Sequence, residues 1–261
     1  MKKILLSSVL LLAMALALPV SAAPKAKFNL PAKAVEVAPG LYRLGTAYDV
    51  ASDNFAEGYA IIHKKGNDAK GGNATKRPGD GSTTCYGFMA SGAKWKNVEP
   101  WEVYTGAGLD GVFLLNNLST NISKWEVAAG TNILGLGSLD SGTVTDPYVL
   151  DNLNQVSFGN LDSGTIAVTV VWGIFSGPKF NRRLVAWDQI YNSDYQWSSS
   201  GEAGKMDFEN IATHELGHSV GMADIYDSSC SEVTMYGYGN YGETKKSSLE
   251  SADIAGIRAL Y

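Results

Sequence analysis

The chain alternates short apolar runs with polar, glycine-containing breaks, a pattern that predicts several strands and a few helices. Runs rich in β-branched and aromatic residues predict strands at residues 40–45, 57–63, 101–104, 165–175 and 184–192. The first two runs are expected to form one hairpin, and the fourth has the composition of a central strand. This mixture of strands and helices predicts an α+β fold with a twisted mixed sheet.

The first of the predicted helices lies around residues 119–130. Ile122, Trp125 and Ala129 recur there at helical spacing. We expect Ser119 or Thr120 as its N-terminal cap and Gly130 as its end, because serine and threonine favour helix N-termini and glycine favours C-termini.

Two further helices follow in the last quarter of the chain. Asp207 is expected to cap a helix that runs through FENIATHELGHSVG. Ser247 and Glu250 stand in capping-box register before an amphipathic segment that ends at Tyr261. The sequence therefore predicts a packed helix at its end.

The composition divides the chain into four segments. Residues 1–22 begin with lysines, continue with an apolar run and end in a small-x-small pattern, which is typical of a cleaved signal peptide. Residues 23–64 form a hairpin segment, and residues 65–84 are glycine-rich and polar, which predicts a flexible linker. Residues 85–261 are long enough for one mixed domain.

Two of these segments leave alternatives open. The N-terminal segment is a propeptide, a small accessory hairpin or part of the main sheet. The alternative to a signal peptide is an uncleaved membrane anchor, but Ser7, Ser8 and Pro19 interrupt a run that is already short for a bilayer.

The charge balance limits the classes of partner. Loss of Lys2 and Lys3 with the signal leaves 19 basic against 26 acidic residues, a net charge of −7. A nucleic-acid-binding protein needs a basic face, so we expect no nucleic acid partner. After the signal, the chain has no apolar run long enough to span a bilayer, so we expect a secreted, extracellular monomer without membrane contact.

Cys85 and Cys230 are the only cysteines. Because an exported protein meets an oxidising compartment, we expect a disulfide between them.

The helix that begins after Asp207 carries the candidate chemistry. His214 and His218 are four residues apart, so both imidazoles leave the helix on one side, one turn from each other. Two imidazoles with that spacing can bind one zinc ion. Glu215 lies beside them, where its carboxylate can act as a general base on a water molecule.

A catalytic zinc needs a third protein ligand. The remaining histidine, His63, lies far upstream in a predicted strand, and we expect no metal role for it. Asp224 follows six residues after His218, and Gly221 between them can adopt the positive φ of a turn. We therefore expect His214, His218 and Asp224 to bind one catalytic zinc ion.

The pattern HELGHSVGMAD with a later VTMY resembles the metzincin metallopeptidases, and the closing LESADIAGIRALY is most similar to the matrixins among them. The resemblance implies that Met235 forms a Met-turn beneath the zinc ligands without binding the metal. It also implies a sheet with an edge strand over the cleft, an active-site helix and a small C-terminal subdomain. Substrate would lie antiparallel to the edge strand, for which we expect residues 184–192.

Two departures from the matrixin pattern matter. Matrixins usually have histidine as the third ligand, where this chain has Asp224. They also carry a structural zinc built from upstream histidines that this chain lacks, so we expect no second zinc. Structural calcium, common in that family, is left open by the Asp and Asn residues of 135–162.

The resemblance gives Cys85 a second interpretation, in which its thiolate caps the zinc and keeps the enzyme latent. The surrounding TCYG does not match the matrixin switch motif, so the disulfide remains the preferred expectation.

Together these features predict a secreted zinc endopeptidase with residues 85–261 as its catalytic domain. It would hydrolyse protein or peptide substrates with a zinc-activated water and Glu215 as general base. The alternative is a secreted binding or adhesion protein on the same fold with a structural or lost zinc site, against which the presence of Glu215 counts. A hydrolase of non-peptide amides would use the same residues.

Overall fold

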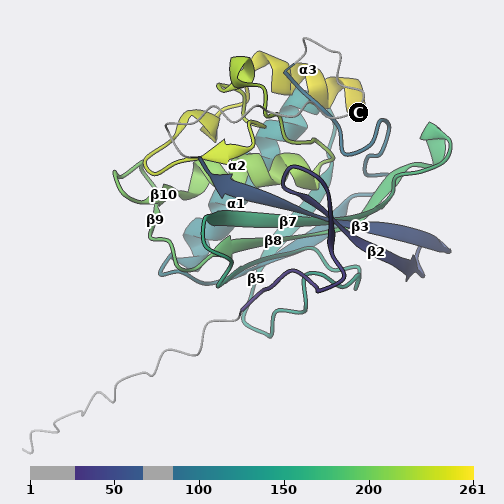
Figure 1. The fold of residues 1–261 in the computed structure, drawn as a ribbon, viewed down its shortest axis with the longest axis horizontal. Coiled ribbons are helices and arrows are strands. Elements are labelled where there is room, and N and C mark those ends of the chain that lie inside the picture. The colour runs from purple at the N-terminus through teal and green to yellow at the C-terminus, as the bar shows by residue number, and fades with distance from the viewer. Residues whose placement is uncertain (1–26, 67–84) are drawn as a thin grey trace, which may run out of the picture.

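The computed structural model describes residues 27–66 and 85–261 (Figure 1). The predicted signal peptide at 1–22 and most of the predicted linker at 65–84 lie outside these residues. No helix in the described part of the chain is long and apolar enough to cross a membrane.

A mixed sheet crosses the middle of the molecule, with α3 and the C-terminus above it in Figure 1. Its strands follow the order β1-β2-β3-β7-β8-β6-β4-β5, and β11 pairs with β3. The strands are β1 Val35–Ala38, β2 Leu41–Asp49, β3 Asn54–Lys65, β4 Glu99–Tyr104, β5 Leu134–Asp140, β6 Gln155–Gly159, β7 Thr165–Ile174, β8 Arg183–Asn192 and β11 Tyr238–Gly239. A separate parallel pair joins β9 Trp197–Ser198 to β10 Met206–Asp207.

The expected α+β fold with a mixed sheet is confirmed. Strands β4, β5, β6 and β8 pair in parallel, whereas β1, β2, β3 and β7 pair antiparallel with their neighbours in the order given above. All five predicted strands are present. The edge position expected for residues 184–192 is wrong, because β8 lies inside the sheet between β7 and β6.

Helix α1 begins two turns earlier than the sequence pattern predicts. It spans Gly111–Ala129, and the Asp110 side chain caps it by accepting a hydrogen bond from the Phe113 amide. Ser119 and Thr120 are therefore not caps; their hydroxyls donate to backbone carbonyls four residues earlier inside the helix. Gly130 ends the helix with a φ of +73°, as predicted.

The two later helices lie where the sequence places them, with one change of cap. Helix α2 spans Phe208–Ser219 and is capped by Asp207, as predicted. Helix α3 spans Ser251–Leu260 and begins at Glu250, whose capping-box partner is Asp253, so Ser247 is not its cap. Instead, Ser247 ends one of the short 3-10 helices found in the described residues, which are η1 Lys179–Asn181, η2 Ser228–Cys230 and η3 Lys245–Ser247.

Two apolar clusters cover the two faces of the sheet. The larger cluster joins α1, α2 and α3 to one face, with Trp125, Leu216 and Ile257 among its buried members. The smaller cluster covers the other face, where Tyr148 and Leu161 pack on residues of β2, β3, β7 and β8. Because side chains alternate along a strand, β3 contributes Ile61 to the first cluster and Ile62 to the second.

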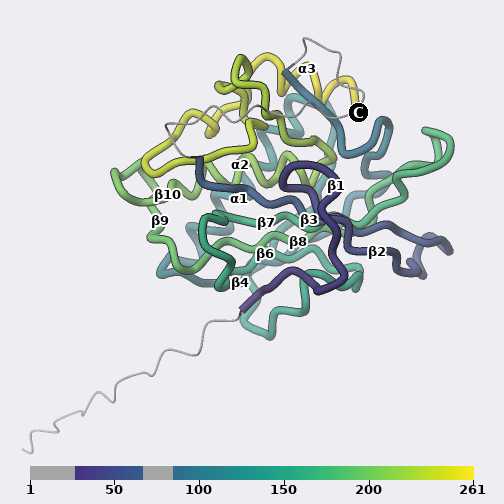
Figure 2. The backbone as a smooth tube through the Cα atoms, in the orientation of Figure 1, coloured from purple at the N-terminus to yellow at the C-terminus, as the bar shows by residue number. Residues whose placement is uncertain are grey.

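The N-terminal hairpin is part of this main sheet. β2 and β3 pair antiparallel, and β3 also pairs with β7 from Glu57 opposite Gly173 to Lys64 opposite Thr165. Figure 2 traces the first described residues, in purple, into β1 and β2 beside β3. Of the three interpretations left open for residues 23–64, this arrangement corresponds to a hairpin within the sheet; the boundaries of the mature protein stay a prediction.

The buried Asp188 of β8 gives the first test of this fold. Its side chain is 3% exposed and accepts a hydrogen bond from the Gln155 amide. Burial, with the nearby carboxylates of Asp151 and Asp146, raises its pKa well above 3.8. The folded state thus holds an extra proton between the unfolded and the folded pKa, so its free energy of unfolding falls as pH rises through that window.

The change Asp188→Asn is expected to remove this dependence. Its stability advantage over the wild type should begin near the unfolded pKa and grow by up to about 1.4 kcal/mol per pH unit until the folded pKa is passed. Denaturant unfolding of both proteins over a series of pH values measures the difference. Parallel stability curves for the two proteins would contradict the raised pKa of the buried Asp188.

Candidate metal centre

Helix α2 places both predicted histidine ligands in the interior. Asp207 caps the helix by accepting a hydrogen bond from the Asn210 amide, and every residue of α2 except Glu209 is buried. His214 and His218 have no exposed surface. Their four-residue spacing brings the two Nε2 atoms to 3.2 Å from each other.

Asp224 completes a group of three ligand atoms. Its Oδ1 atom lies 3.3 Å from the Nε2 atom of His214 and 3.3 Å from that of His218. The three side chains are within the spacing that allows them to share a metal ion. The structure therefore brings together the three residues that the sequence singled out as ligands.

The hydrogen bonds of the two imidazoles orient their lone pairs. His214 Nδ1 lies 2.7 Å from the Thr234 carbonyl oxygen, and His218 Nδ1 lies 3.0 Å from that of Met222. A carbonyl only accepts, so each Nδ1 carries the proton, and each neutral ring presents a lone pair at Nε2. Outer-shell partners of this kind fix the tautomer of metal-binding histidines.

The donor set fits a zinc ion. Two imidazole nitrogens and a carboxylate oxygen are common zinc ligands, and three of them leave a position open. Within the described residues, the buried Oδ1 of Asp224 has no hydrogen-bond partner. Buried acceptors are normally paired, so the three converging atoms call for a cation between them.

The charges of the three groups depend on one another. Burial, with the nearby His63, lowers the pKa of His214 to about 3. Burial alone would lower the pKa of His218, but the Asp224 carboxylate outweighs it and raises that pKa. Burial alone would raise the pKa of Asp224, whereas the two imidazoles hold it well below 3.8.

The turn after α2 directs Asp224 back to the histidines. Gly221 has a φ of +102°, which a residue with a side chain rarely adopts. Beyond it, the Ile225 amide donates to the Met235 carbonyl, and the Tyr226 hydroxyl donates to Asp224 Oδ2 at 3.0 Å. These bonds leave Oδ1 directed at the two imidazoles.

Met235 lies directly beneath the helix that carries the histidines. It is fully buried, and a Cβ added to Gly217 would come within 2.2 Å of its Sδ atom. Glycine between the two histidines thus lets the methionine pack against the α2 backbone. This position matches the floor expected of Met235; its role stays a prediction.

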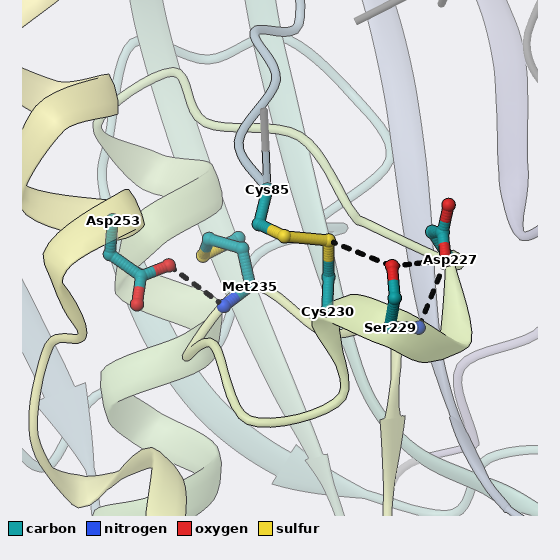
Figure 3. The surroundings of a disulfide bond; sticks show 6 residues. All are labelled: Cys85, Asp227, Ser229, Cys230, Met235 and Asp253. Atoms are coloured by element: carbon teal, nitrogen blue, oxygen red, sulfur yellow. Dashed lines mark hydrogen bonds between the residues drawn. A yellow bond between two sulfur atoms is a disulfide. The ribbon is translucent and has the colours of Figure 1, made fainter. Parts of the chain in front are cut away.

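Asp253 of α3 holds the methionine turn in place, a contact that sequence reasoning missed. Its carboxylate accepts a hydrogen bond from the Thr234 amide at 2.8 Å and one from the Met235 amide at 3.2 Å. Figure 3 shows the second of these bonds. The carbonyl of Thr234 in turn accepts from His214. Asp253 therefore supports His214, a candidate metal ligand, through one intervening residue.

The expected disulfide is present in the structure. It joins Cys85 to Cys230, with 5.4 Å between their Cα atoms (Figure 3). The bond ties the start of the second described range to η2, on the chain between Asp224 and Met235. With both sulfurs bonded to each other, Cys85 offers no thiolate to a metal in this state.

Glu215, the predicted general base, is fully buried beside the three ligand residues. Its Oε2 atom accepts a hydrogen bond from the Thr169 hydroxyl of β7 at 2.6 Å. Its Oε1 atom lies 2.8 Å from Nδ1 of His63. Burial raises the pKa of Glu215, although the charges of His214 and His218 and the Thr169 hydrogen bond act in the opposite direction.

His63 contributes to this centre in a way that the sequence analysis did not expect. It lies on β3, is fully buried, and its ring centroid is 4.0 Å from that of His214. With Glu215 and His214 it forms a second group of potential metal ligands. A histidine at the end of the apolar run GYAIIH, on the same face as Ile61, was the signal that could have identified it.

Lys246 fixes the orientation of the His63 ring. Its buried ammonium lies 3.4 Å from His63 Nε2 and also contacts the Tyr238 carbonyl and Glu243. An ammonium only donates, so His63 Nε2 accepts and Nδ1 donates its proton to Glu215. Burial and the charge of Lys246 lower the pKa of His63 well below 6.5, which keeps the ring neutral.

The described residues contain two groups of three or more His, Cys, Asp and Glu side chains at metal-binding distance, and both lie in this centre. The structural calcium that the sequence left open is not tested by this geometry, because calcium also binds carbonyl oxygens.

Comparison with known proteins gives a partial match. Residues 179–261 match the family model described as Matrixin. Human matrilysin is 40% identical over 75 residues, which cover 28% of this chain and 26% of matrilysin. Matrilysin of Rattus norvegicus is 36% identical over 74 residues, with the same coverage of both chains. The match thus spans about a quarter of the length of these relatives.

Among solved structures, metalloproteinase-II from Bacteroides fragilis matches with 14% identity and a TM-score of 0.34. That match covers 65% of this chain and 53% of the bacterial protein.

The family match includes α2, Asp224, the methionine turn and α3, but not His63 of β3 or Thr169 of β7. Over residues 179–261, this chain is therefore similar in sequence to the matrixins.

Proposed function

We propose that this protein is a secreted zinc endopeptidase that hydrolyses peptide bonds in protein substrates. The observation that carries the proposal is the convergence of His214 Nε2, His218 Nε2 and Asp224 Oδ1 beside a buried glutamate. The matrixin match over the same residues supports it.

The proposed roles follow from the contacts of each side chain. His214, His218 and Asp224 would hold the ion, and zinc, when bound, would polarise the scissile carbonyl and make a water molecule more acidic. Glu215 would take the proton at a carboxylate oxygen and pass it to the leaving amine. Thr169 orients that carboxylate through its hydrogen bond.

The burial of Glu215 suits this role. A general base works best when its pKa is close to the pH of the reaction, and burial raises the pKa of this carboxyl toward that range. A purely structural zinc site has no use for a carboxylate in this position. The alternative, a secreted binding protein with a structural or lost zinc site, therefore lacks an explanation for Glu215.

The change Glu215→Gln tests the proposed base. Glutamine keeps the size of the side chain but cannot take a proton, so we expect kcat/KM for an unfolded protein substrate to fall by about 10²- to 10⁴-fold. The assay compares the intact chain and a chain cut within residues 65–84, each with and without a chelator. Glu209→Gln on the same helix is the matched control, because Glu209 pairs with Lys124 at 37% exposure.

Glu215→Gln should still bind zinc, since the three ligand residues are unchanged. If the wild type binds zinc but cleaves nothing in either form, the peptidase proposal fails and the binding protein takes its place.

The change Asp224→Asn tests the third ligand. Loss of an outer-shell partner typically weakens metal binding about 10- to 100-fold. Loss of a charged direct ligand should cost more, so we expect an increase in the zinc Kd of at least about 100-fold. Competition with a chromophoric chelator measures it, with the exposed Asp162→Asn as a control that should bind like the wild type. An unchanged Kd for Asp224→Asn would remove Asp224 from the ligand set.

A further inference from the structure

We infer that the N-terminal hairpin is a built-in inhibitor of this centre. In this inference, which rests on the proposed peptidase function, β3 occupies the position along β7 that an extended peptide substrate needs, and His63 of β3 holds the general base Glu215.

The first argument comes from the order of the strands. β7 contacts α2 and supplies Thr169 to Glu215, so it is the strand of the sheet next to the candidate base. One edge of β7 pairs with β8, and the other pairs with β3. An extended peptide recognised by a sheet adds to a strand edge, and β3 fills that edge of β7 over the whole length beside the centre.

The second argument comes from the hydrogen bonds of Glu215. His63 lies opposite Ala167 in the β3–β7 ladder and donates from Nδ1 to Oε1, while Thr169 donates to Oε2. Both carboxylate oxygens are thus engaged by donors from the sheet. A carboxylate oxygen can accept a second hydrogen bond, but the His63 ring also lies 4.0 Å from the His214 ring and fills the space beside Oε1 on the side of the candidate metal ligands. A water molecule can approach Glu215 from that side only when His63 leaves.

The hairpin also contacts the residue that positions Asp224. Gly40, in the turn between β1 and β2, has a φ of +70°, and a Cβ there would lie 2.8 Å from the Tyr226 hydroxyl oxygen. That hydroxyl donates to Asp224 Oδ2. The Gly40 carbonyl accepts from the Ile62 amide, which links this turn to β3. The N-terminal segment therefore contacts Glu215 directly through His63, and it lies against Tyr226, the hydrogen-bond partner of Asp224.

The burial of the centre agrees with a closed state. His214, Glu215 and His218 have no exposed surface, and Asp224 is 5% exposed. β3 is held in this position on both faces, because Ile61 and Ile62 belong to the two apolar clusters. At Gly58, the β3 backbone packs closely against the Trp172 ring, because a Cβ at this position would come within 2.6 Å of the ring. A peptide can reach Glu215 only when β3 moves away from β7.

The test measures access to the metal rather than catalysis. The full-length chain is loaded with cobalt(II), and acetohydroxamate is added as a small chelating probe whose binding changes the visible spectrum of the metal. His63→Ala removes the contact to Glu215. Gly58→Ala leaves His63 in place but forces β3 away from Trp172. Ile133→Ala, at a buried position in the α1–β5 connection, controls for general loosening.

A site that is open in only a small fraction of molecules shows an affinity reduced by that fraction. We expect the wild type and Ile133→Ala to respond weakly, and each of the two β3 variants to bind acetohydroxamate at least tenfold more tightly. Far-UV circular dichroism and one bound cobalt per chain confirm folded variants. If one of the two β3 variants does not fold, the other alone is enough to test the inference.

Three outcomes overturn the inference. The first is a wild-type chain that binds acetohydroxamate as tightly as the β3 variants. The second is folded, cobalt-loaded β3 variants that remain as closed as the wild type, and the third is an equal gain in affinity for Ile133→Ala. A wild-type chain that binds no metal refutes the proposed function, and this inference with it, whereas failure of the inference alone leaves metal binding intact.

Discussion

The convergence of three proton acceptors in the interior constrains the rest of this molecule. Two imidazole nitrogens and one carboxylate oxygen lie within 3.3 Å of one another, in a region that water does not reach. Such a group is stable only with a cation or a proton between its members. The elements around it serve to keep it together: α2 sets the spacing of the histidines, the turn at Gly221 returns Asp224, and the carbonyls of Thr234 and Met222 fix the ring tautomers.

The support extends to parts of the chain that are distant in sequence. Asp253 of α3 holds the turn whose carbonyl orients His214, and the disulfide ties Cys85 to the chain between Asp224 and that turn. From the other side, β3 brings His63 to Glu215, and Lys246 fixes the His63 ring. Glu215 and Asp224 are buried carboxylates, and Lys246 is a buried ammonium that already pairs with Glu243, so a divalent cation would help to offset the two carboxylates.

Features that depend on neighbouring residues could be predicted from the sequence, whereas contacts between distant segments could not. The spacing in HELGHSVGMAD was enough to predict that His214, His218 and Asp224 converge, because helix geometry and a glycine turn are local properties. The cap of α1 was misplaced because serine and threonine also bond to carbonyls inside a helix. The edge strand was misassigned because strand order depends on pairing between segments far apart in sequence, and the residue pattern of β8 carries no record of its neighbours. The sequence analysis expected no role for His63 because its contact with Glu215 also depends on pairing between distant segments.

The central claim is that His214, His218 and Asp224 together bind one zinc ion. It is tested most directly by anomalous X-ray diffraction at the zinc absorption edge, on crystals of the zinc-loaded chain. The account predicts one strong anomalous peak per chain at bonding distance, about 2.0–2.2 Å, from His214 Nε2, His218 Nε2 and an oxygen of Asp224. A zinc ion held by other residues, or a centre that contains no zinc in fully loaded protein, would contradict it.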